Sequence, residues 1–306
     1  MVADFLPSSS VQIQDPEAIA LLQRIQRRVV QVPLQQGTMD VETAYVHSIP
    51  DSPAASGKVP MLLLHGFDSS LLEFRRLIPL LVKTQEAWAI DLFGSGFTDY
   101  ISTLAVNPQT IRHHLLNALE TWIQRPVILV GASLGGAVAI DFALHHPTWV
   151  RSLILIDSVG FSGTFPVGPF LPNPLIELGT DWLYFRKYVA LSAALVLPMM
   201  NVTLIDALRC SLLHQEMPGW KEAIASFTRS GGYANLSERM AEVIHSTLIL
   251  WGDADDVLGT ADATQFLHAI PDSRLVWIQG AGHVPHFDQP QVVANHLLSF
   301  AGQAGR

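Results

Sequence analysis

The sequence predicts an α/β fold built on a mostly parallel sheet, and two observations support this. Short aliphatic runs recur along the chain, and segments with apolar residues at every third or fourth position separate them. Strands that are apolar on both faces are typical of a parallel sheet covered by helices, and the alternation is typical of β-α-β connections. The predicted strands are 27–33, 42–50, 61–64, 87–90, 127–130, 153–156, 247–251 and 275–278.

The predicted helices occupy the intervals between these strands. Pro147 disfavours continuation of the third helix beyond His146. A Pro/Ser/Gly-rich stretch at 50–60 predicts a connection between the second and third strands. The segments with helical periodicity are 71–82, 109–123, 134–146, 261–269 and 291–300.

One long interval interrupts the alternation. About ninety residues between Asp157 and Thr247 are rich in Phe, Leu, Pro and Trp, and they show helical patterns but no convincing strand. An insertion of this length in a regular sheet is typical of a lid or cap over a site. We therefore predict a core formed by 1–158, with an N-terminal extension at 1–28, and by 241–306, and a helical cap at 159–240.

The longest nearly apolar run, 188–200, lies inside the predicted cap. It is shorter than the about 20 residues that cross a bilayer, and Pro198 would interrupt a helix. The simplest interpretation is a helix buried in the core. The alternatives are that the run lines an apolar substrate cavity or contacts a membrane surface.

The composition excludes several classes of function. The chain of 306 residues has 18 Lys and Arg against 27 Asp and Glu, a formal charge of −9, which argues against a nucleic-acid partner. Cys210 is the single cysteine, so no internal disulfide and no Cys-rich metal site can form. The N-terminus lacks the features of a signal or transit peptide, which predicts that the protein stays in the compartment where it is made.

Ser133 is the strongest candidate for a catalytic nucleophile. The stretch from Gly131 to Gly135 matches G-x-S-x-G, and it lies after a predicted strand and before a predicted helix, as a nucleophile elbow requires. In such a strained turn the neighbouring backbone comes too close for a side chain at either glycine. We therefore predict Ser133 as the nucleophile and Gly131 and Gly135 as residues that permit the turn.

A serine nucleophile needs a base, and His283 is the best placed of the 12 histidines. It follows the predicted strand 275–278, on a loop that can hold its ring over the carboxyl edge of the sheet, and the chain order of serine, acid and histidine fits this fold. His286 is three residues further on, and we interpret it as a structural or pocket neighbour. The other histidines lie on amphipathic helices or have no motif around them.

The acid is expected in the turn after the strand 247–251, where Asp253, Asp255 and Asp256 occur within four positions. One of them should accept the imidazole N–H and hold the histidine tautomer. Asp255, three residues after the glycine, has the usual position for this loop. Asp157, at the end of the strand 153–156, is the alternative acid, because the requirement is geometric.

The oxyanion of an acyl-transfer intermediate also needs donors. The backbone N–H of Leu134, which follows the nucleophile, is one candidate. The second is the N–H of Phe67, in the loop where His65 and Gly66 turn the chain after the strand 61–64. We expect His65 to brace this loop rather than to exchange protons.

Together these motifs make the chain resemble the α/β-hydrolase superfamily from about residue 40 to 301. The motifs are His-Gly-Phe at 65–67, G-x-S-x-G at 131–135, G-x-x-D at 252–255 and Gly-His at 282–283. The resemblance implies a mostly parallel eight-stranded sheet flanked by helices, with a helical cap inserted after the sixth strand. It also implies an esterase-type serine mechanism with no cofactor and no metal.

Three stretches resemble one branch more closely, the chlorophyll dephytylases of plants and cyanobacteria, which release phytol from chlorophyll. They are LLLHGFDSSLLEFRRLIPLL, RPVILVGASLGGAVAIDFALHHP and GWKEAIASFTRSGGY. This resemblance implies Ser133 as nucleophile, Asp255 as acid and His283 as base. The chain departs from the plant pattern at Ala132, where those proteins tend to carry proline, and at Gly259, where many hydrolases do.

The resemblance also implies a source, a location and a substrate. The plant proteins begin with a plastid transit segment that is absent here, so we expect a prokaryotic, cyanobacterial protein in the cytoplasm or at the periphery of the thylakoid membrane. The expected partner is a lipophilic ester, chlorophyll in the first place. The alternatives are a lipase or carboxylesterase for other lipophilic esters, a C–C bond hydrolase, and a non-catalytic protein of this fold that binds a pigment or another ligand.

Overall fold

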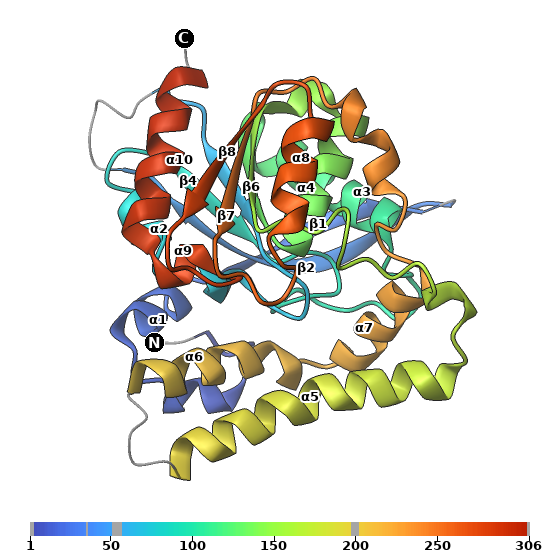
Figure 1. Ribbon diagram of the computed structural model, residues 1–306. Helices are drawn as coiled ribbons and strands as arrows, with labels where there is room; N and C mark the ends of the chain where they lie inside the picture. The colour runs from blue at the N-terminus through green and yellow to red at the C-terminus, as the bar shows by residue number, and fades with distance from the viewer. Residues whose placement is uncertain (1–2, 35, 51–56, 197–201, 305–306) are drawn as a thin grey trace.

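The computed structural model describes residues 3–34, 36–50, 57–196 and 202–304. In this part of the chain, eight strands form one sheet in the order β1-β2-β4-β3-β5-β6-β7-β8 (Figure 1). The pairs β1 with β2 and β2 with β4 are antiparallel, and all other neighbours are parallel. The predicted mostly parallel α/β sheet is confirmed. The strands are β1 Gln26–Pro33, β2 Thr38–Ser48, β3 Met61–Leu64, β4 Ala87–Ile90, β5 Val127–Ala132, β6 Val150–Ile156, β7 Thr247–Gly252 and β8 Ser273–Ile278.

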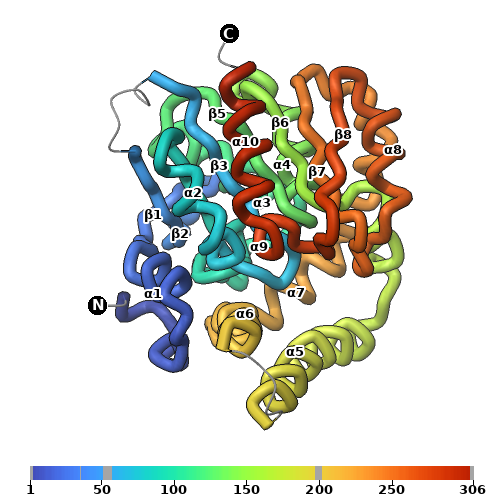
Figure 2. Tube along the Cα trace, turned by 60° about the vertical axis from the view of Figure 1, so that its left-hand side comes forward, coloured from blue at the N-terminus to red at the C-terminus, as the bar shows by residue number. Residues whose placement is uncertain are grey.

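Helices cover both faces of this sheet, as the two views in Figures 1 and 2 show. One face packs against α3 (Pro108–Ala118), α4 (Leu134–His145) and α8 (Ala261–Ala269). The other packs against α1 (Pro16–Leu22), α2 (Ile78–Leu81) and α10 (Pro290–Ala304). The shorter helices are η1 Ser8–Gln12, η3 Leu71–Phe74, η4 Leu119–Ile123, η5 Pro147–Trp149 and α9 Pro285–Asp288.

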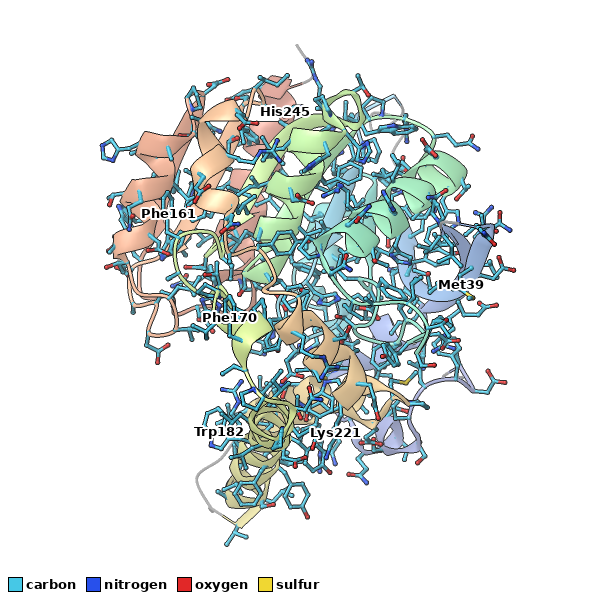
Figure 3. All side chains as sticks on the ribbon, turned by 90° about the vertical axis from the view of Figure 1, so that its right-hand side faces the viewer. Met39, Phe161, Phe170, Trp182, Lys221 and His245 are labelled. Carbon is cyan, nitrogen blue, oxygen red and sulfur yellow. The ribbon has the colours of Figure 1, made fainter. Side chains whose placement is uncertain are left out.

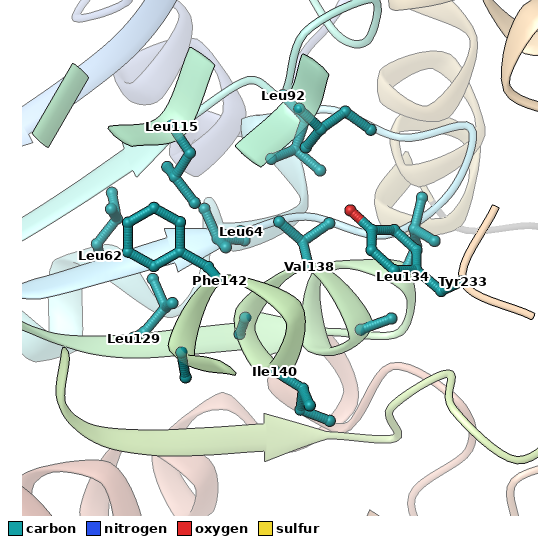
Figure 4. Packing of buried hydrophobic residues seen from close by; sticks show 14 of the residues in the cluster. Leu62, Leu64, Leu92, Leu115, Leu129, Leu134, Val138, Ile140, Phe142 and Tyr233 are labelled. Atoms are coloured by element: carbon teal, nitrogen blue, oxygen red, sulfur yellow. The ribbon is translucent and has the colours of Figure 1, made fainter. Parts of the chain in front are cut away.

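The pattern of the central strands explains this two-sided cover. Every residue of β3 is buried, and its side chains alternate between two cores: Leu62 and Leu64 pack on the α4 side, while Met61 and Leu63 pack on the α2 side. Figure 4 shows Leu62 and Leu64 near Phe142 of α4. Each such side chain contributes roughly 1.5–3 kcal/mol when fully buried. A run with no polar position therefore specifies a central strand.

Two predicted helices are interrupted. The segment 71–82 forms η3 and then α2, because Pro79 stands at the start of α2 and has no N–H to continue an earlier turn. The segment 109–123 forms α3 and then a π-helical turn, η4, which ends where Gln124 takes a left-handed conformation with φ 58°. Helical periodicity predicted the buried faces but not these breaks.

The segment between β6 and β7 is helical and lies across the carboxyl edge of the sheet (Figure 1). The long helix α5 packs on α6 and α7 and forms the outermost layer. No helix among the described residues is long and apolar enough to cross a bilayer. The helices here are α5 Asn173–Val196, α6 Val202–Leu213 and α7 Trp220–Arg229, with short helices η6 Gly168–Phe170, η7 His214–Glu216 and η8 Leu236–Glu242.

The prediction of a buried core helix at 188–200 is wrong for the part that the structure describes. Residues 188–196 are the last turns of α5, where Ala194 is buried but Tyr188, Val189, Leu195 and Val196 are exposed. The reason is that α5 packs on the protein through one side only. Residues 197–200 of the apolar run lie outside the described residues.

Candidate active site

Ser133 lies at the turn between β5 and α4, in a backbone conformation that few residues adopt. Its φ is 50° and its ψ is −117°, and its N–H donates to the carbonyl of Ile156 over 2.9 Å. A non-glycine residue at such a positive φ stores strain, which is typical of a nucleophile elbow. A Cβ at Gly131 would collide with the backbone of Gly135, and one at Gly135 would collide with the carbonyl of Leu64. Both glycines are therefore required by close backbone contact.

His283 connects the serine to a carboxylate. Its Nε2 lies 3.0 Å from the Oγ of Ser133, and its Nδ1 lies 3.0 Å from the Oδ2 of Asp255. His283 follows β8 and Asp255 follows β7, so parallel strands bring both side chains to the sheet edge where β5 delivers the serine. The imidazole is in position to accept the hydroxyl proton while the carboxylate holds its other N–H.

The environment of Asp255 stabilises its charged form. Its Oδ1 accepts the N–H groups of Val257, at 2.8 Å, and Leu258, at 3.1 Å. Burial alone would raise the pKa of Asp255, but the hydrogen bond with His283 and these backbone donors outweigh it and hold the pKa below its ordinary value. Asp255 is thus a carboxylate at neutral pH. The neighbouring Asp253 is exposed and accepts the N–H of Gly280, and Asp256 is also exposed.

Asp157 lies close to the same group but in a different state. It is fully buried, its Oδ1 accepts the N–H of Gly252 at 2.9 Å, and its Oδ2 has no hydrogen-bond partner among the described residues. Burial raises the pKa of Asp157 to about 9, and the nearby charge of Asp255 acts in the same direction. Asp157 is therefore a neutral acid at pH 7, and it makes no hydrogen bond to His283 in the part of the chain that is described.

The two predicted oxyanion donors belong to segments that adjoin the serine. Leu134 is the first residue of α4, and Phe67 follows Gly66, whose Cα lies close enough to Ser133 that an added Cβ would come within 3.3 Å of the serine Cβ. Across the described residues, neither the Leu134 nor the Phe67 N–H donates to a protein acceptor. Two unengaged amides beside the hydroxyl are what an oxyanion hole requires.

His65 braces this loop and does not exchange protons at neutral pH. It is fully buried, its Nε2 accepts the N–H of Leu92 at 3.2 Å, and its Nδ1 lies 2.8 Å from the carbonyl of Gly66. Burial lowers the pKa of His65 to about 4. The ring is therefore neutral and fixes the course of the chain into Phe67.

Three side chains of this site also form the group of potential metal ligands found within the described residues. Asp157, Asp255 and His283 each offer a ligand atom, and these atoms lie within 4.8 Å of one another. However, the two ring nitrogens of His283 face Asp255 and Ser133, and Asp157 is protonated. Metal ligands must be deprotonated and free to bind, so this geometry favours a proton relay over a metal site.

Sequence reasoning missed Asp68, which follows Phe67 in the loop 65–70 between β3 and η3 and connects that loop to the cap. We call this loop the oxyanion loop, after the role predicted for Phe67. Asp68 is buried with φ 50°, and its carboxylate accepts hydrogen bonds from His214, Gln215 and Trp220 at 2.8 to 3.0 Å. The ammonium group of Lys187 on α5 lies 2.8 Å from the same carboxylate and also donates to the Asp68 carbonyl. We call these five residues the Asp68 cluster.

The Asp68 cluster is an ion pair within a buried polar network. Burial opposes the charge of Asp68, but the bonds with His214 and Lys187 outweigh it and hold the pKa of this carboxyl well below its ordinary value. Its partners come from α5, η7 and α7, more than 100 residues later in the chain. No local motif indicates such a contact. Only the structure shows it, because His214 and Lys187 of the cap are placed against Asp68.

A second buried pair lies on the other side of the oxyanion loop. Glu73 accepts the N–H of Gly66 at 3.1 Å and the hydroxyl of Ser69 at 2.7 Å, and the Nε2 of His286 lies 2.9 Å from its other oxygen. Burial would raise the pKa of Glu73, but His286 and Ser69 lower it to about 2. His286 thus lies buried beside Glu73, which holds the loop through Gly66 and Ser69.

A cavity of about 240 Å³ lies between the oxyanion loop, α6 and the histidine loop. Val284, the residue after His283, forms part of its wall, and Glu73 and Ser69 form another part. On the other side of the loop, the ring of Phe67 packs against Phe165 at 5.2 Å and Phe227 at 6.0 Å between ring centroids. Aromatic side chains thus surround Phe67, whereas the cavity has both apolar and polar residues in its wall and is not lined by Ser133 or His283.

Comparison with known proteins gives the same superfamily. Residues 61–296 match the model of a family described as the alpha/beta hydrolase family. The chain is 35% identical over 301 residues to the alpha/beta hydrolase domain-containing protein VTE7 of Arabidopsis thaliana, with 97% of this chain and 89% of that protein covered. It is 26% identical over 257 residues to Lipase 1 of Psychrobacter immobilis, with 79% and 76% covered.

The fold is also found among solved structures. A thermophilic esterase from Thermogutta terrifontis superposes with a TM-score of 0.72 at 20% identity, covering 91% of this chain and 99% of the esterase. A match at this identity shows a shared fold. The family match covers most of the chain, and the relative from Arabidopsis is similar over nearly its full length. The protein therefore belongs to the alpha/beta hydrolase family.

Proposed function

We propose that this hydrolase is a serine-dependent carboxylic ester hydrolase (EC 3.1.1) with Ser133, His283 and Asp255 as its catalytic residues. The observation that carries the proposal is the continuous relay from the Ser133 hydroxyl through His283 to Asp255, with 3.0 Å at each step. Spacings of this length at both steps are what proton transfer through an oriented imidazole requires.

In the proposed mechanism, His283 removes the hydroxyl proton as Ser133 attacks the ester carbonyl. The N–H groups of Phe67 and Leu134 bind the oxyanion of the tetrahedral intermediate. His283 then gives its proton to the departing alcohol, and water, deprotonated by the same ring, releases the acid from the acyl-enzyme. Asp255 stays ionised throughout and stabilises the imidazolium.

We propose chlorophyll as the ester, with phytol as the alcohol and chlorophyllide as the acid. The support is the resemblance of three stretches, around Phe67, Ser133 and Trp220, to chlorophyll dephytylases, and the aromatic side chains of Phe165 and Phe227 that pack on Phe67. The 240 Å³ cavity is smaller than the about 300–1,000 Å³ of pockets that enclose a whole drug-sized ligand. It would take a segment of the phytyl chain, and the macrocycle would lie outside it.

Incubation of chlorophyll a and pheophytin a with the protein, followed by pigment chromatography, tests this function. We expect chlorophyllide or pheophorbide from the native chain and none from Ser133→Ala. If neither pigment reacts while simple lipid esters are cleaved in a Ser133-dependent way, the dephytylase function is wrong and the protein is a lipase or carboxylesterase for other esters. If the folded chain binds the pigments but cleaves no ester, it is a binding protein.

A further inference from the structure

The outward side of α5 is an apolar surface that no described part of the chain covers. Side chains at alternating spacings of three and four residues project from it, and together they form what we call the outer stripe. Three of them, Leu178, Trp182 and Phe185, are 65%, 59% and 62% exposed. The members of the outer stripe are Leu175, Leu178, Trp182, Phe185, Val189 and Val196.

The outer stripe lies opposite the side of α5 that packs on the protein. At 100° per residue, Ile176, Thr180 and Lys187 share the inward side, and the first two are buried while Lys187 enters the Asp68 cluster. The stripe residues project about 180° from them. A helix that is apolar on both sides is normally covered on both sides, so the outer stripe is a surface that fits an apolar partner.

The charges of α5 are arranged around the stripe rather than within it. Asp181 pairs with Lys221 of α7, and Glu177 lies with them on that flank of the helix. Figure 3, which looks nearly along α5, shows Trp182 and Lys221 on opposite sides of the helix. On the stripe side, the guanidinium group of Arg186 lies 5.3 Å from the centre of the Trp182 ring. The carboxylates thus lie on the exposed flank of α5 next to α7, and a cation accompanies the aromatic residues.

We propose that the outer stripe docks the cap onto the surface of a lipid bilayer. Trp and Phe side chains at the level of the headgroups, with an arginine beside them, are typical of interfacial helices that enter a bilayer by only about 5–10 Å. A second copy of the chain fits the stripe less well. A stable protein interface takes about 20–30 residues a side, whereas the stripe offers six from one helix.

This docking would explain how the proposed hydrolase reaches its substrate, and it rests on that proposed function. The cap lies across the edge of the sheet that carries Ser133 and His283, and α5 is the layer furthest from the sheet (Figure 1). A bilayer against the outer stripe would hold the cap, and the catalytic edge behind it, next to esters dissolved in the membrane. The alkyl part of such a substrate would then enter the protein without crossing water.

Flotation with vesicles tests the docking without depending on catalysis. The Ser133→Ala chain is mixed with vesicles of phosphatidylcholine and phosphatidylglycerol in equal parts, and the fraction that floats with the lipid is measured. We expect this chain to float, and Trp182→Ser combined with Phe185→Ser to lower its partition coefficient about tenfold or more. The control is Ile244→Ser, at an even more exposed apolar residue (77%) before β7, at the opposite edge of the sheet, which should not change flotation.

Two further measurements separate the docking from the proposed function. With Ser133 restored, hydrolysis of the soluble ester p-nitrophenyl butyrate should stay within about twofold in the stripe variant, because its side chains point away from the site. The docking proposal is overturned if the intact chain does not float, if the stripe variant floats equally well, or if sedimentation shows a dimer that the variant dissociates. Failure of the soluble ester to react with any chain would instead overturn the proposed function.

Discussion

The edge of the sheet that carries Ser133 and the outer layer of the cap differ in how many contacts determine each residue. At the edge, Ser133 is flanked by glycines that touch neighbouring backbone, and Asp255 accepts three hydrogen bonds. In the outer layer, α5 touches the protein through one side, and its other side is apolar and exposed. Backbone geometry thus fixes the residues of the proposed catalytic site, whereas the proposed encounter with substrate depends on a surface that folding leaves open.

The sharpest test of the proposed site compares its two buried acids, Asp255 and Asp157. Asp255→Asn should lower kcat for p-nitrophenyl butyrate by about 10³–10⁴, because the amide cannot stabilise the imidazolium or hold its tautomer. Asp157→Asn should lower kcat less than tenfold, because Asp157 is neutral and the His283 Nδ1 is hydrogen-bonded to Asp255 instead. The reverse ranking would show that the acid is Asp157, at the end of β6.

The two sides of α5 should differ strongly in their contribution to stability. Ile176→Ala, on the inward side, should lower the free energy of unfolding by about 2–5 kcal/mol, because it leaves a cavity where a 3% exposed side chain packs. Leu178→Ala, on the outer stripe, should change it by no more than about 0.5 kcal/mol. Urea denaturation measures both, and equal losses would mean that the outer stripe is covered in solution.

The Asp68 cluster tests whether the cap and the edge act together. Asp68→Asn places an amide N–H against the donors of Gln215 and Lys187, so the oxyanion loop should shift. We expect kcat/KM to fall about 10- to 100-fold as a result. Asp181→Asn, which removes an exposed carboxylate from the same helix as Lys187, is the matched control and should leave kcat/KM unchanged.

A double-mutant cycle completes this test. If Asp68 and Lys187 act through one network, Lys187→Met should cost much less in the Asp68→Asn background than in the native chain. Strict additivity of the two effects, or full activity in Asp68→Asn, would show that the cap and the oxyanion loop are not coupled.

Asp157 should also make stability depend on pH. Its pKa is raised to about 9 in the folded chain, well above the unfolded value near 4, so the folded state binds one more proton between these values and loses stability as pH rises. Asp157→Asn keeps the acceptor for the Gly252 N–H and removes this titration. Relative to the native chain, the free energy of unfolding of the variant should therefore rise by roughly 1 kcal/mol per pH unit from pH 5 to 8. Parallel pH profiles of the two chains would contradict a neutral Asp157.

The sequence predicted the parts of the molecule that local rules determine. Continuous apolar runs predicted the central strands because only a strand covered on both faces needs every residue apolar, and G-x-S-x-G placed Ser133 because few residues tolerate an elbow. The prediction of Asp255 followed from its loop position, whereas the backbone donors to Asp255 and the burial of Asp157 are visible only in the structure.

The cap was predicted less well because its determinants are distant in sequence or absent from the chain. The Asp68 cluster joins residues more than 100 positions apart, and neither His214 nor Lys187 carries a motif. The apolar run at 188–200 has the same hydropathy whether protein or lipid covers it. Composition shows that a surface is apolar, and only the packing of α5 shows which side is left uncovered.

Labelling with a fluorophosphonate probe tests the central claim most directly, because the probe reacts only with a serine that a neighbouring base activates. Mass spectrometry of the digested protein should find one adduct, on the peptide that carries Ser133. Ser133→Ala should carry none, and His283→Ala should react at least 100-fold more slowly. A native chain that is folded by circular dichroism and yet stays unlabelled, or is labelled at another serine, would contradict the assignment of this site.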